Sequence, residues 1–140
     1  MQVYKIKINK HTGTDFREVR KKAFGLYTEI AHSTKRRPYV RSVYFEKEKI
    51  FLDLFWSHLF EKKNRRDRMR RVRYFGCAIE LIQKTRLKPT TKPNPNKKSE
   101  TFYRFYGITM DGEMFCVQIK EDKNTQQKFL VSVFPTDELV

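Results

Sequence analysis

His58 is the side chain in this sequence best suited to proton transfer. It follows the apolar segment 50–56 and precedes a strongly basic one, and an imidazole ordinarily titrates close to neutral pH. A base, an acid and cations are what RNA cleavage requires when the 2′-hydroxyl of the RNA attacks the adjacent phosphate, so that route needs no metal ion. The competing interpretation is a structural histidine near the start of a helix, packed beside Trp56.

Arg104 is the second residue that could take part in such chemistry. It lies in an apolar strand-like segment between Tyr103 and Phe105, with Tyr106 close by, so one short strand carries a guanidinium group and two phenols. Proteins bind single-stranded RNA by stacking side chains on its bases and by contacting its phosphates. Other polar residues in apolar strand-like segments are Gln118, Lys120 and Ser132. Alternation of side chains on the wet face of a sheet also explains such residues, and we prefer that explanation for Gln118.

No motif for a metal ion or nucleotide cofactor is present. The sequence lacks a phosphate-binding loop, a dinucleotide-binding glycine pattern and a zinc-protease motif, and its acidic residues do not cluster. Cys77 and Cys116 are isolated within apolar patterns, so we expect two free buried thiols and no disulfide. We therefore expect neither a cofactor nor a metal ion.

Positive charge is concentrated between residues 62 and 73. This segment of twelve residues holds eight basic residues and one acid, in a chain with a formal net charge of +15. Arginine gives planar, bidentate recognition of phosphate, and like charges at helical spacing destabilise a helix that has no polyanion beside it. The alternative is a solvated helix face that keeps the protein soluble. The residues expected to bind nucleic acid here are Lys62, Lys63, Arg65, Arg66, Arg70 and Arg73.

The segment 86–100 is predicted to be a basic loop rich in proline and lysine. It contains three prolines and shows no apolar periodicity. Lys97 and Lys98, with the other cations of the segment, could wrap a phosphate backbone. A mobile connector whose charge discourages collapse is an equally good interpretation.

The elements that must position these residues form an α+β pattern. Alternating or apolar runs predict strands, three- and four-residue apolar spacing predicts helices, and Thr14 or Asp15 is expected to cap the first helix. The predicted strands are 3–8, 39–45, 50–55, 102–109, 113–120 and 128–134; the predicted helices start near 15, after Trp56 with Ser57 as cap, and at 69–82. We expect one domain, 1–140, with helices packed on an antiparallel β-sheet and a C-terminal three-stranded meander.

The charge and the hydropathy of the chain restrict its partners. A sequence pI near 10 favours a nucleic acid or an anionic membrane surface. The membrane is the weaker choice, because the apolar stripe of the helices is needed for the core. No apolar run approaches the length of a bilayer span, and the N-terminus lacks the apolar region of a signal peptide, so a cytoplasmic protein is expected.

The sequence resembles the small ribonuclease toxins grouped around barnase, EndoU, the colicin ribonucleases and RelE, in particular their phage and mobile-element members. The resemblance covers about residues 50–135 and lies in the order of a basic helix, segment 74–82, a proline-broken loop and a meander ending at 129–134. The segment before it has no counterpart in that group.

This resemblance implies helices followed by a four-stranded antiparallel sheet, and an active site of His, Arg or Lys, Tyr and Ser or Thr on the sheet face. The positions it implies in this chain are His58, Arg104, Ser132 and Tyr103. It implies a metal-independent, toxin-like endoribonuclease, with RNA as substrate and an antitoxin protein as partner. The alternative is a non-catalytic RNA- or DNA-binding module that uses the basic helix and loop.

Overall fold

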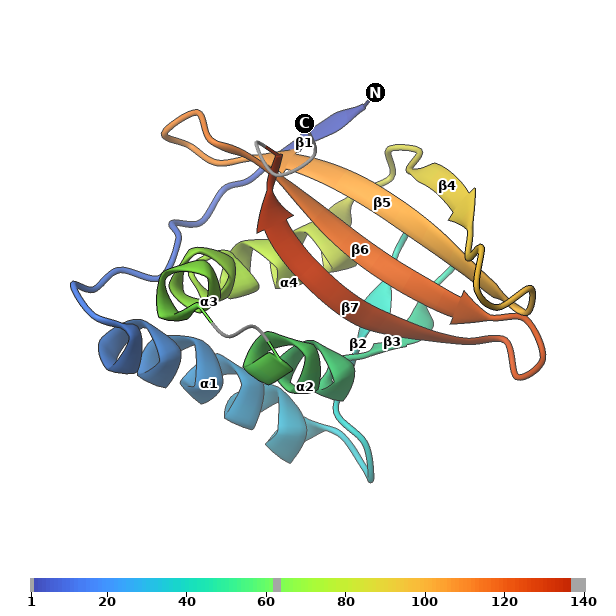
Figure 1. The fold of residues 1–140 in the computed structure, drawn as a ribbon, viewed down its shortest axis with the longest axis horizontal. Coiled ribbons are helices and arrows are strands. Elements are labelled where there is room, and N and C mark those ends of the chain that lie inside the picture. The colour runs from blue at the N-terminus through green and yellow to red at the C-terminus, as the bar shows by residue number, and fades with distance from the viewer. Residues whose placement is uncertain (1, 62–63, 137–140) are drawn as a thin grey trace.

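The computed structural model describes residues 2–61 and 64–136, in which helices and strands are interspersed along the chain (Figure 1). The strands are β1 (Val3–Lys5), β2 (Tyr39–Ser42), β3 (Glu48–Phe51), β4 (Thr90–Pro93), β5 (Glu100–Ile108), β6 (Met114–Asp122) and β7 (Gln127–Pro135). The helices are α1 (Phe16–Ser33), α2 (Asp53–Glu61), α3 (Arg65–Val72) and α4 (Phe75–Lys84). The predicted α+β class is confirmed.

The strands form one mixed sheet in the order β1-β5-β6-β7-β3-β2, and β4 also pairs with β5. β1 runs parallel to β5 and β3 runs parallel to β7, while the other pairs are antiparallel. The prediction of a purely antiparallel sheet is therefore wrong. Helices lie between the members of each parallel pair along the chain, and such long connections allow parallel pairing.

The C-terminal strands β5, β6 and β7 are antiparallel neighbours at the centre of this sheet. The first hairpin turns at Gly112, whose φ of 88° is in the region that favours glycine, as the Asp111-Gly112 pair predicts. The meander is thus present, but it belongs to a larger mixed sheet, and strands from the N-terminal half extend it on both sides.

α4 lies against one face of the β5–β7 strands (Figure 1), and the apolar core between them continues to residues of α1, α2, β2 and β3. Phe75, Leu81 and Phe115 are fully buried there. Gly107 allows the close approach of helix and sheet, because a Cβ at this position would lie 2.8 Å from the Phe115 ring and 2.9 Å from Leu81 Cδ1. On the opposite face of β5–β7, Tyr106, Cys116 and Phe134 form a second, smaller apolar cluster.

The strand predicted at 50–55 ends earlier than expected, because α2 begins at Asp53. Ser57 therefore lies inside this helix, and its predicted role as a cap is wrong. Phe55 and Leu59, four residues apart, are both 2 % exposed, so a short apolar run supplies a buried helical stripe here instead of a two-faced strand. This change places His58 well inside a helix.

The helix predicted over 69–82 is divided in two between Val72 and Phe75. The segment after β1 supplies hydrogen-bond partners at the break: the His11 amide donates to the Arg73 carbonyl (2.9 Å), and the Gly76 amide donates to His11 Nε2 (3.2 Å). The apolar periodicity continues across the break, from Val72 at the end of α3 to Phe75 and Ile79 of α4, which are all buried. Periodicity alone could not show the interruption.

The first helix follows its prediction closely. Asp15 is the N-cap of α1, and its carboxylate accepts a hydrogen bond from the Glu18 amide at 2.9 Å. The Glu18 carboxylate in turn accepts from the Thr14 amide at 3.1 Å. These two bonds satisfy backbone donors that a helix start leaves without partners.

The predicted loop 86–100 contains a strand. β4 pairs antiparallel with β5, with Thr90 opposite Arg104, so the loop prediction is wrong for Thr90–Pro93. All four residues of β4 are exposed, which is why the segment shows no apolar alternation. An edge strand rich in lysine and proline is protected against pairing with other chains.

Candidate functional site

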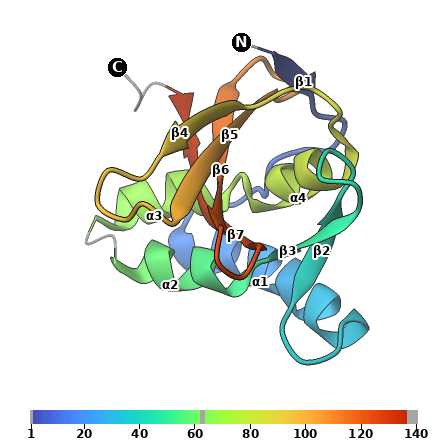
Figure 2. The ribbon, with the colours of Figure 1, turned by 90° about the vertical axis from the view of Figure 1, so that its right-hand side faces the viewer.

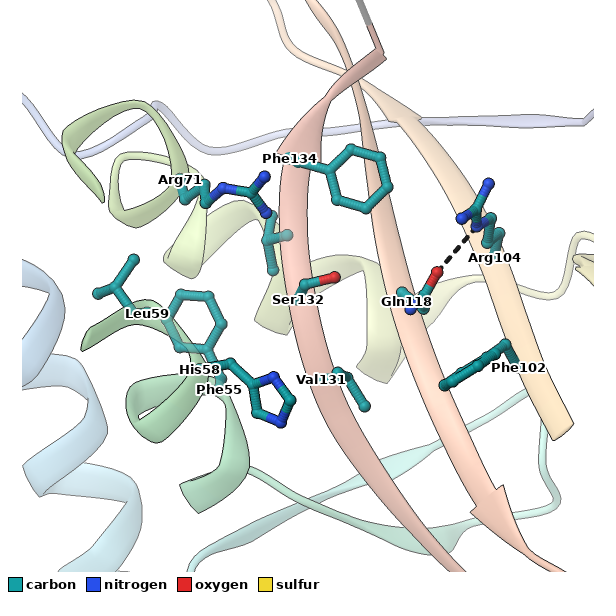
Figure 3. A pocket seen from close by; sticks show the side chains of 11 residues that line it. Phe55, His58, Leu59, Arg71, Phe102, Arg104, Gln118, Val131, Ser132 and Phe134 are labelled. Atoms are coloured by element: carbon teal, nitrogen blue, oxygen red, sulfur yellow. Dashed lines mark hydrogen bonds between the residues drawn. The ribbon is translucent and has the colours of Figure 1, made fainter. Parts of the chain in front are cut away.

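A pocket of about 460 Å³ lies where this second face of β5–β7 meets α2 and α3 (Figure 3). Its walls come from segments far apart in the sequence, and Figure 2 shows β4 on one side of this region and α2 with α3 on the other. The lining residues are Phe55, His58 and Leu59 of α2, Arg71 of α3, Phe102 and Arg104 of β5, Gln118 of β6, and Val131, Ser132, Val133 and Phe134 of β7.

The floor of the pocket is a polar row across three strands. Arg104 pairs with Gln118, and Gln118 pairs with Ser132, so the three side chains lie on one face of the sheet. Arg104 Nε donates a hydrogen bond to Gln118 Oε1 at 2.8 Å. This bond holds the guanidinium group at a defined place beside the pocket.

A β-bulge in β7 puts Ser132 on that row. Ile119 pairs with Leu130 but its neighbour Gln118 pairs with Ser132, so Val131 is an extra residue in the strand. Leu130 and Val133 are both in the core, while Val131 and Ser132 line the pocket between them. The bulge therefore turns the Ser132 hydroxyl toward the pocket, as bulges beside active sites often do for a side chain.

His58 reaches the pocket from α2. Its side chain is 43 % exposed, and Figure 3 shows the imidazole on the side of the helix that faces β7. Phe55 and Leu59 are buried on the same part of the helix and anchor it. His58 Nδ1 lies 3.9 Å from a carboxylate oxygen of Glu61, one turn later. The imidazole of His58 therefore lies between Glu61 of its own helix and strand β7.

Two guanidinium groups share the ring of Phe134 above the polar row. The Arg71 guanidinium carbon lies 5.5 Å from the ring centroid and that of Arg104 lies 5.9 Å from it. Contacts at this range are attractive and orient the cations. Arg71 Nε also lies 3.3 Å from both carboxylate oxygens of Asp67, and only 11 % of its side chain is exposed. The pocket is therefore electropositive and prepared for an anion.

Tyr103 is separated from this group. Neighbouring residues of a strand point to opposite faces, so Tyr103 lies on the other side of the sheet from Arg104. Its hydroxyl donates to Glu121 Oε1 at 3.0 Å, and its ring packs 5.0 Å from that of Phe45. Burial, and then the bond to Glu121, raise the pKa of Tyr103. The structure thus brings His58, Arg104 and Ser132 together and leaves Tyr103 out.

The expected nucleic-acid-binding residues are distributed over several surfaces. Arg66 is exposed on α3, and Arg70 and Arg73 line a separate pocket beside Tyr74. Lys97 and Lys98 are exposed in the connection between β4 and β5. Lys62, Lys63 and the side chain of Arg65 lie outside the described part of the chain. The expectation that Arg66, Arg70 and Arg73 bind nucleic acid stays a prediction.

Arg73 has a structural role. Its guanidinium group donates to the His11 carbonyl at 3.2 Å and to the Gly13 carbonyl at 2.6 Å. Both acceptors belong to the segment that leads from β1 into α1. Arg73 therefore ties this segment to the break between α3 and α4, and its expected contact with phosphate stays a prediction.

Arg71 and Gln118 line the pocket but were not expected there. Arg71 had a usable signal, because it stands four residues after Asp67, the single acid of the basic segment, and such pairs meet on a helix. Gln118 had none, because its partner depends on the register of β5 against β6. Sequence patterns do not contain that register.

The cysteines do not take part in this chemistry. Both are free and buried, as predicted. Burial raises the pKa of Cys116 to about 12 against an opposing effect of Arg104, and burial, followed by Glu80, raises the pKa of Cys77 to about 11. Thiols with such pKa values are poor nucleophiles at neutral pH.

Within residues 2–61 and 64–136, no group of three or more His, Cys, Asp or Glu side chains is arranged to hold a metal ion. In the same part of the chain, no helix has the length and apolar character to cross a membrane. Comparisons with protein-family models, curated proteins and solved structures find no match. The chemistry of the pocket is therefore the basis for assigning a function.

Proposed function

We propose that this protein is a metal-independent endoribonuclease that cleaves RNA through attack of the 2′-hydroxyl on the adjacent phosphate. One observation carries the proposal: a single pocket gathers an imidazole, two guanidinium groups and a hydroxyl from four separate elements. These are the side-chain types that the reaction needs. Positioned cations also stabilise the negative charge that the phosphate gains in the transition state.

His58 is proposed to move the protons. The lining of the pocket contains this imidazole and no carboxylate. The imidazole takes the proton of the 2′-hydroxyl while the bond from the 2′-oxygen to phosphorus forms. The bond from phosphorus to the 5′-oxygen then breaks, and the same imidazolium returns a proton to the leaving oxygen. The products are a 2′,3′-cyclic phosphate and a free 5′-hydroxyl, and no oxidant or water is consumed.

Arg71 and Arg104 are proposed to stabilise the charge on the phosphorane. Both guanidinium groups are oriented before substrate binds, Arg104 by Gln118 and Arg71 by Asp67. Donors that need no reorganisation at the moment of reaction stabilise a transition state most effectively. Ser132 lies on the same row as Arg104, and its hydroxyl can donate to a non-bridging phosphate oxygen.

Incubation of purified protein with total RNA in EDTA tests the proposal. We expect cleavage in EDTA and 2′,3′-cyclic phosphate ends, with rates reduced at least about 10²-fold in His58→Ala and in Arg104→Ala. His32→Ala, on the exposed end of α1, is the matched histidine control and keeps the wild-type rate. Loss of cleavage in EDTA, or full cleavage by both pocket variants, would refute the proposal.

The second candidate is a non-catalytic RNA- or DNA-binding module. It is favoured by exposed cations outside the pocket, Arg66 on α3 and Lys97 and Lys98 between β4 and β5. Such a module binds RNA tightly and leaves it intact. A toxin-like role and an antitoxin partner belong to the first proposal and rest on the resemblance to small ribonuclease toxins. The proposed cytoplasmic location rests on the hydropathy of the sequence.

A further inference from the structure

A second row of side chains lies beside the polar row on the same sheet face. Phe102 pairs with Lys120, Lys120 pairs with Phe129, and Phe129 pairs with Phe51, so the row crosses β5, β6, β7 and β3. Phe102 also lines the pocket. It stands two residues from Arg104 along β5, which separates the two rows by about 7 Å. We call Phe102, Lys120, Phe129 and Phe51 the aromatic row.

Cations are held over this row at fixed positions. The Arg37 guanidinium carbon lies 4.9 Å from the ring centroids of both Phe51 and Phe129. Its Nε donates to the two carboxylate oxygens of Asp53, at 2.9 and 2.8 Å. Lys120 Nζ lies 5.4 Å from the Phe129 centroid. These contacts and Asp53 keep the charges on the surface of the sheet.

The Lys120 ammonium is positioned from its other side by Glu100. The two groups lie 3.3 Å apart, and only 10 % of the Glu100 side chain is exposed. Asn94 donates a further hydrogen bond to Glu100 at 2.9 Å. Burial alone would raise the pKa of this carboxyl, but its hydrogen bonds and the neighbouring lysines together lower the pKa below its usual value. A buried, charged anchor of this kind orients Lys120 along the row.

We propose that the aromatic row binds the unpaired nucleotide next to the scissile phosphate, so that the substrate is single-stranded RNA. This inference rests on the proposed endoribonuclease function. The base stacks on Phe102, and its phosphate lies against Lys120 and Arg37. Stacking on an aromatic ring requires a base that is free of its duplex partner, and the nearby cations then track the backbone.

Binding of a non-cleavable RNA separates this inference from the catalytic one. The probe is an unstructured RNA oligonucleotide with 2′-O-methyl groups, which cannot supply the attacking hydroxyl, and a duplex of the same length is its counterpart. We expect the wild-type protein to prefer the single strand. Phe102→Leu and Lys120→Met should each weaken that binding by about tenfold, in line with the loss of one stacked base.

Lys21→Met on α1 is the matched control, because it removes the same charge from an exposed position on another surface. It should leave the affinity for the single strand unchanged. Circular dichroism at the start of each titration establishes that Phe102→Leu and Lys120→Met are folded, and the more conservative Phe102→Tyr should restore binding.

Wild-type affinity in both row variants, or equal affinity for duplex and single strand, overturns the inference. If ordinary RNA is still cut in EDTA, the proposed endoribonuclease stands without this subsite. Binding that depends on Phe102 and Lys120 while ordinary RNA stays intact supports the nucleotide site and refutes the enzyme. An absence of binding to either probe overturns the site.

Discussion

Replacing Gln118 by methionine should reduce RNA cleavage by orienting Arg104 less well. Methionine keeps the length of the side chain but cannot accept the 2.8 Å hydrogen bond from Arg104 Nε. A hydrogen bond to a charged group contributes about 1.5–3 kcal/mol. If that orientation is needed only in the transition state, the rate of the chemical step falls by roughly 10- to 150-fold.

The reasoning also predicts how Gln118→Met combines with Arg104→Ala. Gln118 is proposed to act through Arg104, so it has nothing to orient once the guanidinium group is absent. The double variant should therefore cleave RNA no more slowly than Arg104→Ala alone, because residues that act as one unit are not additive.

Single-turnover cleavage of a labelled RNA in EDTA measures all four proteins of this cycle. Urea unfolding of each protein controls for stability, since an Arg104 cation without its acceptor could also loosen the sheet. Additive losses in the cycle would refute the positioning role of Gln118. A wild-type rate in Gln118→Met would show that the hydrogen bond has no part in the reaction.

Four further outcomes test the structure. His11→Gln should make the free energy of unfolding depend less on pH below neutrality. Burial, and then Lys22, lower the pKa of His11 in the folded protein. His11 therefore contributes to stability above about pH 6.5, and this contribution is lost as the pH falls. Urea midpoints from pH 5 to 8 measure this, and parallel curves for the two proteins would contradict it. Gly107→Ala should lower the free energy of unfolding by about 1–3 kcal/mol through the clash between α4 and the sheet, and an unchanged urea midpoint would speak against so tight a contact. Tyr103→Phe should cleave RNA at the wild-type rate. A large loss of rate would instead show that the Tyr103 hydroxyl takes part in cleavage. Arg73→Ala should lower the melting temperature without changing the salt dependence of RNA binding, and the reverse pattern would assign Arg73 to phosphate contact.

Several features of this protein follow from local sequence. Asp15 and Glu18 have the spacing of a capped helix start, and α1 begins there. Gly112 supplies the backbone freedom that a hairpin turn needs, and β5 and β6 meet at that turn. Side chains alternate between the two faces along a strand, so the adjacent positions of Tyr103 and Arg104 already place them on opposite faces of the sheet. Local patterns of this kind predict elements and faces well.

The tertiary structure alone decided how the candidate site is assembled. His58 and Ser132 reach one pocket because α2 packs beside β7 and because a bulge at Val131 changes the face of that strand. Gln118 orients Arg104 through the register of two strands. Strand direction, register and helix breaks depend on contacts between segments far apart in the chain, whose free energies are balanced over the whole fold. Residue types and spacing determine which groups are available, and long-range packing determines which of them meet.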